Sequence, residues 1–285
     1  MWLEPQKLQT FITRETGLAF KATTGIDGDG QRWYALHPVG PHLDQSFAIR
    51  TTVGWRRFHI SFEPGKFAGD LLSAMGRADE TGRAAFQAVL SDCRERGAQI
   101  ETSVNGYTKT FDGSSLWNER WTRFHLKINK GQIELGAEDG EPDDAIIRNW
   151  TGRFAAAIVA ILPLEEEVNA LIPSAESYPE GALTYVQANR YERDRRNRAA
   201  AISIHGTSCA ACGMDFGQTY GPIAVGHIEV HHTTPVSELG PGYVINPARD
   251  LIPLCANCHT VAHKRNPPFT ADEIADFMEI YKPQT

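Results

Sequence analysis

The sequence predicts an α+β protein built of two domains, and three observations lead to this prediction. The chain has 285 residues, enough for one large or two ordinary domains. In its first part, segments of strand character alternate with helical segments, as in a largely antiparallel sheet with helices. All six tryptophans precede residue 151, whereas every cysteine that belongs to a CxxC pair follows it. The two parts therefore differ in composition, as separate domains do.

The first part has a clear order of expected elements. A short helix is expected at residues 5–16, and residues 67–96 look helical with a break near Gly76 or Gly82. A long helix at residues 145–171 closes this part. Strands are expected at residues 33–37, 47–53, 56–62, 99–104, 120–128 and 132–135. This order predicts a mixed α+β domain with a mainly antiparallel sheet.

The stretch between the two parts has the composition of a linker. Residues 172–182, "IPSAESYPEGA", are rich in Pro, Ser, Gly and Glu. We therefore expect a first domain at residues 1–174, a linker at 175–183 and a second domain at 184–285. The second domain reads as a helix, a CxxC pair, a strand, a loop, a strand, a second CxxC pair and a terminal helix.

Charge and hydropathy exclude some classes of protein. The net charge is −7, so the chain is no polycation, although nucleic-acid binding depends on where the positive charge sits. No stretch approaches the roughly 18 apolar residues of a membrane span. Residues 154–164 are too short for one and include Pro163, so a buried helix is expected there. The first residues lack the pattern of a signal peptide, and we expect a cytoplasmic protein.

Four of the five cysteines form two CxxC pairs that predict a metal site. Cys209 and Cys212 are separated from Cys255 and Cys258 by 42 residues. Two such pairs complete a tetrahedron of thiolates around one ion and leave no position for substrate. We therefore expect a structural zinc ion. The alternatives are two unrelated CxxC pairs or a redox pair, and the βαβ pattern that a redox pair needs is absent. The fifth cysteine, Cys93, is expected to pack inside a helical region.

Four histidines lie close to the second CxxC pair in the sequence. His231 and His232 are adjacent on an expected strand, so their side chains point to opposite faces. His259 and His263 are four residues apart and share one face of a helix. Three of these imidazoles could bind one divalent ion and leave positions open for water or phosphate, as in a catalytic site. The alternative is extra zinc ligands or surface histidines.

These residues resemble a known family, the HNH (ββα-metal) endonucleases, and most closely its McrA-type subgroup of modification-dependent restriction enzymes. The resemblance covers residues 181–268 and lies in "NRYERDRRNRAAAISIHGTSCAACGMDF" and "IEVHHTTPVSELG…NPARDLIPLCANCHTVAH". It implies that two strands and a helix hold one catalytic ion, while a zinc knuckle of four cysteines holds the surrounding loops. The expected fold is then an N-terminal α+β domain followed by a C-terminal ββα-metal HNH domain.

The resemblance also implies roles for single residues. His231, His259 and His263 match the family's ligands of the catalytic ion. His232 matches the general base, which must stay off the ion to accept a proton from water. Glu229 falls where some members carry a carboxylate that supports a metal ligand, and a solvated strand residue is the alternative.

The middle asparagine of the HNH name has no direct counterpart. At its usual position the chain has Asp250, whereas Asn246 lies four residues earlier and Asn257 lies inside the second CxxC pair. We favour Asp250 or Asn246 as the side chain that holds the loop and orients His232.

The implied function is metal-dependent hydrolysis of phosphodiester bonds in double-stranded DNA, giving 5′-phosphate and 3′-hydroxyl ends. Ligation by nitrogen alone lets Mn²⁺, Co²⁺, Ni²⁺ or Zn²⁺ compete with Mg²⁺. The first domain would recognise modified DNA, and cutting both strands with one site per chain would suggest a homodimer. Alternatives are a zinc-containing DNA-binding protein that does not cut, a nuclease for unmodified DNA, and a nuclease that acts on RNA or as a toxin.

Two further groups of residues are candidates for contacts with DNA. Arg190, Arg193 and Arg196 recur every three residues, so they lie along one side of an expected helix and could bind phosphates. Pairing with Glu192 and Asp194 on a solvated helix is the alternative. In the first domain, aromatic and arginine side chains could stack a base or bind phosphate unless they fill the core. These are Trp55, Arg56, Arg57, Trp117, Arg120, Trp121 and Arg123.

Overall fold

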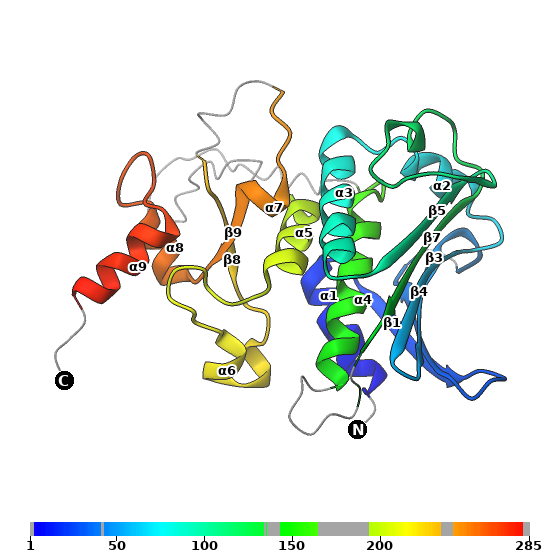
Figure 1. The fold of residues 1–285 in the computed structure, drawn as a ribbon, viewed down its shortest axis with the longest axis horizontal. Helices are drawn as coiled ribbons and strands as arrows, with labels where there is room; N and C mark the ends of the chain where they lie inside the picture. Colours follow the sequence, from blue (N-terminus) through cyan, green and yellow to red (C-terminus); the bar gives the residue numbers. More distant parts are fainter. Residues whose placement is uncertain are drawn as a thin grey trace, which may run out of the picture.

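The computed structural model of the protein describes residues 3–40, 43–133, 135, 143–164, 194–234 and 242–281. The described residues form a large antiparallel sheet with helices on one side, and beyond these helices a smaller part with a two-stranded sheet (Figure 1). The α+β class, the antiparallel sheet and the order of the two parts agree with the prediction.

The large sheet has seven strands in the order β1-β2-β3-β4-β7-β5-β6, and all neighbouring strands are antiparallel. Their bounds are β1 (Phe20–Ile26), β2 (Arg32–Pro38), β3 (Phe47–Gly54), β4 (Arg57–Pro64), β5 (Gln99–Val104), β6 (Tyr107–Thr108) and β7 (Phe124–Gly131).

Alternation along the strands separates two faces of this sheet. In β4, Phe58, Ile60 and Phe62 are buried in the main core, while the residues between them are more exposed. This alternation is typical of a strand with one face on a core and the other toward water. The buried face carries few polar groups. The hydroxyl of Thr51 makes a hydrogen bond with the hydroxyl of Thr151 in the covering helix, with 2.9 Å between the two oxygens.

Helices α1 (Pro5–Thr16), α3 (Glu80–Glu95) and α4 (Asp143–Ala160) lie on the buried face (Figure 1). The predicted break in residues 67–96 is confirmed, because α2 (Gly69–Met75) ends at Gly76 and α3 begins after Asp79. Gly82 lets α3 approach α4 closely, since a Cβ there would lie 2.4 Å from the carbonyl oxygen of Ala160.

Residues 154–162 of the apolar stretch are buried in this domain, as expected, whereas Pro163 is exposed. Among the described residues, no helix is both long and apolar enough to span a membrane. The helix predicted at 145–171 begins two residues earlier and ends at Ala160, and residues 165–171 lie outside the described residues.

Three local predictions for the first part were wrong or incomplete. Strand β1 was not predicted, because Thr and Gly interrupt its pattern of apolar residues. No strand begins at Gln132, whose positive φ of 56° ends β7. Trp121 precedes β7 instead of belonging to it, and its buried indole N–H donates to the carbonyl oxygen of Leu116 at 2.9 Å.

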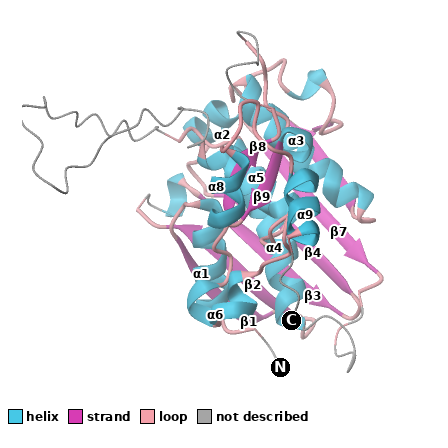
Figure 2. Ribbon diagram, turned by 90° about the vertical axis from the view of Figure 1, so that its left-hand side faces the viewer, coloured by secondary structure: helices cyan, strands magenta, loops and turns pink. Residues whose placement is uncertain are grey.

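The second part is built of short elements, seen from its own side in Figure 2. Strands β8 and β9 pair in antiparallel register, with His231 opposite Ile252 and His232 opposite Leu251. A capping box of Thr270 and Glu273 begins the terminal helix. The elements are α5 (Arg195–His205), α6 (Phe216–Tyr220), β8 (Glu229–His232), α7 (Pro247–Asp250), β9 (Leu251–Leu254), α8 (Ala256–Ala262) and α9 (Ala271–Ile280).

Helix α5 packs against both parts of the molecule. Ala199 and Ala200 belong to the large core beside α3 and α4, whereas Ile202 belongs to the small core around the cysteines. Small alanine side chains allow this close packing on two sides. The expected linker at 175–183 and the first part of the helix expected from residue 184 lie outside the described residues, so the domain bounds remain predictions.

Candidate functional site

The sulfur atoms of Cys209, Cys212, Cys255 and Cys258 all lie within 4.8 Å of one another. Three of the four side chains are buried and Cys212 is half-buried. The Sγ atoms of Cys212 and Cys255 are 3.8 Å apart. Two thiolates bound to one zinc ion at about 2.3 Å in a tetrahedron are also about 3.8 Å apart. The four cysteines are therefore positioned for a metal site, and they fit zinc.

Backbone hydrogen bonds hold the two CxxC turns together. Gly213 has a positive φ of 71°, which lets its N–H return to the carbonyl of Cys209 at 2.8 Å. The N–H of Ala210 donates to Pro253 of β9 at 2.9 Å, and this bond fixes the first turn against the strand. Burial by itself would raise the pKa of Cys209, but backbone N–H groups lower it to about 7. A lowered pKa favours the thiolate that binds metal.

A second group lies next to the cysteines, where one nitrogen from each of His231, His259 and His263 falls within 4.8 Å of the others. The three ring centroids are 4.9 to 5.1 Å apart, and the rings meet edge to face. The Nε2 atoms of His259 and His263 are 3.3 Å apart. Two imidazole nitrogens at about 2.0–2.1 Å from one ion in a tetrahedron would be separated by about 3.3 Å.

The expected carboxylate, Glu229, contacts this group. Nδ1 of His259 lies 2.5 Å from Oε2 of Glu229, so the ring nitrogen can donate its proton to the carboxylate. That bond leaves the lone pair on Nε2, the atom that faces His263. A carboxylate behind a histidine commonly sets its tautomer and strengthens it as a metal ligand.

His231 is prepared to act as a neutral ligand. Burial, followed by the neighbouring histidines, lowers its pKa to about 4. Its Nδ1 atom is buried and makes no hydrogen bond among the described residues. A buried polar atom without a partner usually has an ion or a water beside it. The donor set of three neutral nitrogens fits a borderline divalent ion.

His232 is outside this group of three histidines, although it is adjacent to His231 in β8. Alternation along a strand directs the two side chains to opposite faces. His232 is 6% exposed. The structure thus separates the two adjacent histidines in the way that the sequence predicts.

The loop before β9 is held by Asp250, one of the two residues favoured for the place of the middle asparagine. Its carboxylate accepts from the hydroxyl of Tyr243 at 2.8 Å, from the N–H of Asn246 at 2.8 Å and from Arg249 at 2.9 Å. Its backbone oxygen accepts from the N–H of Thr233 at 2.9 Å, directly after His232. Asp250 therefore links the loop to the end of β8.

The other candidates lie at helix ends. Asn246 caps α7 by accepting from the N–H of Ala248 at 3.0 Å, and Asn257 is exposed near the start of α8.

The carboxyl of Asp250 has a lowered pKa. Burial by itself would raise this pKa, but the hydrogen bonds that the carboxylate accepts lower it. A charged carboxylate is the group that three donors at this position require.

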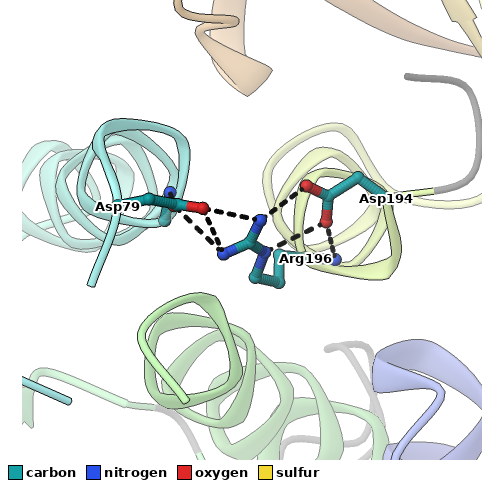
Figure 3. A network of polar contacts seen from close by, with 4 residues as sticks. Asp79, Asp194 and Arg196 are labelled. Atoms are coloured by element: carbon teal, nitrogen blue, oxygen red, sulfur yellow. Dashed lines mark hydrogen bonds and ion pairs between the residues drawn. The ribbon is translucent and has the colours of Figure 1, made fainter. Parts of the chain in front are cut away.

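Arg196 does not lie free for phosphate (Figure 3). Its guanidinium donates to Asp79 at 3.1 and 3.2 Å and to Asp194 at 3.0 and 3.2 Å. These carboxylates cap α3 and α5, so the arginine ties the two helix starts together. The structure thus shows for Arg196 the stated alternative, a pair with Asp194, and adds Asp79 as a second partner. Arg190 and Arg193 lie outside the described residues.

The tryptophans of the first domain divide in two ways. Trp121 is fully buried and Trp117 stacks on it with centroids 5.2 Å apart, so the core alternative holds for both. Trp55 is 84% exposed at the turn between β3 and β4, beside Arg56, which has a positive φ of 55°. Among the described candidates, Trp55, Arg56 and Arg57 are exposed together at this turn, whereas Arg120 and Arg123 are exposed beside tryptophans that pack in the core.

One contact near the site had no signal in the sequence. Arg198 of α5 donates to the carbonyl of Ile228 at 3.1 Å, immediately before Glu229. Glu15 of α1 is buried and lies near Gly226, where a Cβ would be 2.5 Å from its Oε1. Such contacts join residues far apart in the chain, and no local motif predicts them.

Comparison with known families locates this site within a recognised domain. Residues 209–265 match the family model described as HNH endonuclease. The matched segment contains all four cysteines and the three clustered histidines. The match supports a nuclease of the HNH family and, with it, DNA binding. No curated protein and no solved structure matched the chain.

Proposed function

We propose that this protein is a metal-dependent endonuclease that hydrolyses phosphodiester bonds in double-stranded DNA. The observation that carries the proposal is the convergence of His231, His259 and His263 within 4.8 Å inside the HNH domain. The four thiolates beside it would fill every ligand position of an ion, so an ion bound there would have a structural role. Three neutral imidazoles leave room for a phosphate oxygen and water.

Each residue of the site then has a role. His231, His259 and His263 would hold the divalent ion, which when bound would supply a Lewis acid for the charge on the phosphate and the leaving oxygen. His232, on the other face of β8, takes the proton from the attacking water as a neutral imidazole. Glu229 keeps the Nδ1 proton of His259 and so directs its other nitrogen toward the ion.

The metals differ between the two sites. Four cysteines select zinc for structure. The three histidines are compatible with Mg²⁺, Mn²⁺, Co²⁺, Ni²⁺ or Zn²⁺, and nitrogen ligation favours the later transition metals over Mg²⁺.

We further propose that the protein is a restriction enzyme of the McrA type, in which the first domain directs cleavage to modified DNA. The exposed turn of Trp55, Arg56 and Arg57 supports a DNA contact by this domain. A domain that reads unmodified sequence is the alternative. Two chains acting as a homodimer would cut both strands.

Cleavage of a supercoiled plasmid by the full chain tests the nuclease. We expect nicking and linearisation with Mn²⁺, Co²⁺, Ni²⁺ or Mg²⁺, and none with chelator. His232→Ala should lower the rate by at least about 100-fold, the lower end of general-base effects, while the affinity for DNA is kept. His227→Ala is the matched control, because His227 packs on Phe216 outside both clusters.

Two outcomes would change the proposal. If the protein binds DNA but cuts with none of the metals, it is a DNA-binding protein held together by zinc. If His232→Ala cuts at the rate of the unaltered protein, His232 is not the base. Plasmids of one sequence, prepared plain, with methylated cytosine and with phosphorothioate linkages, test the target. Equal cleavage of all three would contradict recognition of modified DNA.

A further inference from the structure

The seven-stranded sheet has a second face that α1, α3 and α4 do not cover. These helices lie on the side of the buried strand residues, and the HNH elements lie beyond them (Figure 1). The side chains between the buried ones, such as His59 and Ser61 in β4 and Lys127 in β7, point to the other side. This second face, the open face, is polar, and its side chains hold one another in position.

A chain of hydrogen bonds crosses three strands on the open face. Asn129 of β7 donates its amide N–H to Oε1 of Glu101 in β5 at 2.5 Å. That bond turns the amide oxygen of Asn129 toward Nδ1 of His59 in β4, 2.6 Å away. An amide oxygen can only accept, so Nδ1 of His59 carries the proton. In the neutral ring, Nε2 is then an acceptor with a fixed direction.

Arg50 of β3 is also held in place on this face. Its guanidinium lies 4.3 Å over the ring of Trp33, and its Nε is 4.0 Å from Glu63. Trp33 lies against Gly25 of β1, where a Cβ would come within 2.5 Å of the indole. Glycine thus makes room for the ring that supports the arginine. An arginine fixed in this way loses less side-chain entropy when it binds an anion.

The strand register places Arg50 and Lys127 in one row across β3, β4 and β7. Arg50 is opposite Ser61, and Ser61 is opposite Lys127 on the next strand. Neighbouring strands are about 4.8 Å apart, so the three form one row. Among the described strand residues, the open face carries four cations and two carboxylates, a difference of two positive charges, on a chain of net charge −7, and Lys127 is opposite Glu101. They are Lys21, Arg50, Arg57 and Lys127, and Glu63 and Glu101.

We propose that the open face is a docking surface for duplex DNA. Arg50 and Lys127 contact backbone phosphates, and Nε2 of His59 accepts a hydrogen bond from a donor of the DNA. This inference rests on the proposed nuclease function, since it supplies that enzyme with a second DNA contact. The helices separate this face from β8 and α8 (Figure 1), so the DNA segment held here is not the segment that is cut.

The test measures the affinity of the full chain for a labelled 30-base-pair duplex at several salt concentrations. Arg50→Gln with Lys127→Gln should raise Kd about five- to tenfold and lower the slope of log Kd against log salt by about one per lost phosphate contact. Arg94→Gln with Lys7→Gln is the matched control. Arg94 also lies over an aromatic ring, Phe111 at 4.9 Å, and pairs with a carboxylate, Asp112 at 2.9 Å.

His59→Phe tests the neutral contact separately. It should raise Kd severalfold and leave the salt slope unchanged, because no phosphate contact is lost. Thermal unfolding of each variant shows whether the fold is kept. An unchanged Kd and slope for the Arg50 and Lys127 double variant would overturn the docking surface. An unchanged Kd for His59→Phe would remove His59 from it.

Cleavage assays keep this inference separate from the proposed function. The double variant should need more plasmid for half-maximal rate but keep the maximal rate. If the unaltered protein cuts and the double variant shows the same dependence on plasmid, the docking surface fails and the nuclease stands. If the open face binds DNA but nothing is cut, the nuclease fails and the surface stands.

Discussion

The four cysteines and the three histidines make two clusters of similar size with opposite exposure. Three cysteines are buried and the fourth is half-buried, whereas the histidines range from buried His231 to exposed His263. Helix α8 belongs to both clusters, because Cys258 and His259 are adjacent on it. A metal bound by the cysteines would therefore fix the helix that carries His259, and the histidine cluster is the more exposed of the two.

The largest expected effect comes from disrupting the cluster of four cysteines. Cys255→Ser removes one of four thiolates but keeps a side-chain oxygen that can cap α8, so the effect reports on the metal site. The small core around the cysteines offers little burial to replace about 10–16 kcal/mol of zinc-linked folding energy. We expect loss of zinc and unfolding of the second part, measured by metal analysis and circular dichroism.

Cys93→Ala is the matched control for that experiment. Cys93 is fully buried in the core of the first part, where burial raises the pKa of its thiol to about 12. Its removal should leave the zinc content unchanged and cost no more than about 1–3 kcal/mol. A zinc-loaded, folded Cys255→Ser protein would show that the four cysteines are not the structural site.

A smaller effect is expected at the open cluster. Glu229→Gln keeps an acceptor near His259 but removes the negative charge. The affinity for the catalytic ion or the cleavage rate should fall about 10- to 100-fold, while the zinc content stays constant. Titration of cleavage with Mn²⁺ measures this, with Glu95→Gln on α3 as the control. If the dependence of cleavage on Mn²⁺ is unchanged, Glu229 is a solvated strand residue that does not support a metal ligand.

The smallest effect concerns Glu15 of α1, which lies beside Gly226 of the second part. Burial raises the pKa of Glu15 above its ordinary value of 4.5. Since the folded pKa exceeds the unfolded one, the free energy of unfolding falls as pH rises from about 4.5 to the folded pKa. Glu15→Gln should remove this decline, which urea unfolding at several pH values measures. An unchanged pH dependence would show that Glu15 titrates normally.

The sequence predicted both clusters because their members lie in short local patterns. Two cysteines three positions apart fit one turn, and two histidines four positions apart share a helix face. Strand β1 was missed because its alternation is interrupted, and only pairing with β2 reveals it.

Arginine roles could not be predicted in this way. Arg196 lay in a regular pattern that suggested a phosphate contact, but its partner Asp79 is 117 positions away in the chain. A charge pattern shows that positive groups are present, and the packing of α3 on α5 decides which of them are neutralised. Arg50 was not among the arginines predicted from the sequence to contact DNA, but in the structure it lies on the open face.

The sequence by itself determined the α+β class, the two sets of metal-binding side chains and the division of His231 and His232 between opposite faces of a strand. These depend on residue type and on spacing over a few residues, where backbone geometry leaves few choices. Only the tertiary structure decided that Glu229 contacts His259, that Arg196 joins two helix starts, and that His59 is oriented across three strands. Each of these depends on chain segments brought together by burial of apolar surface, which no local pattern records.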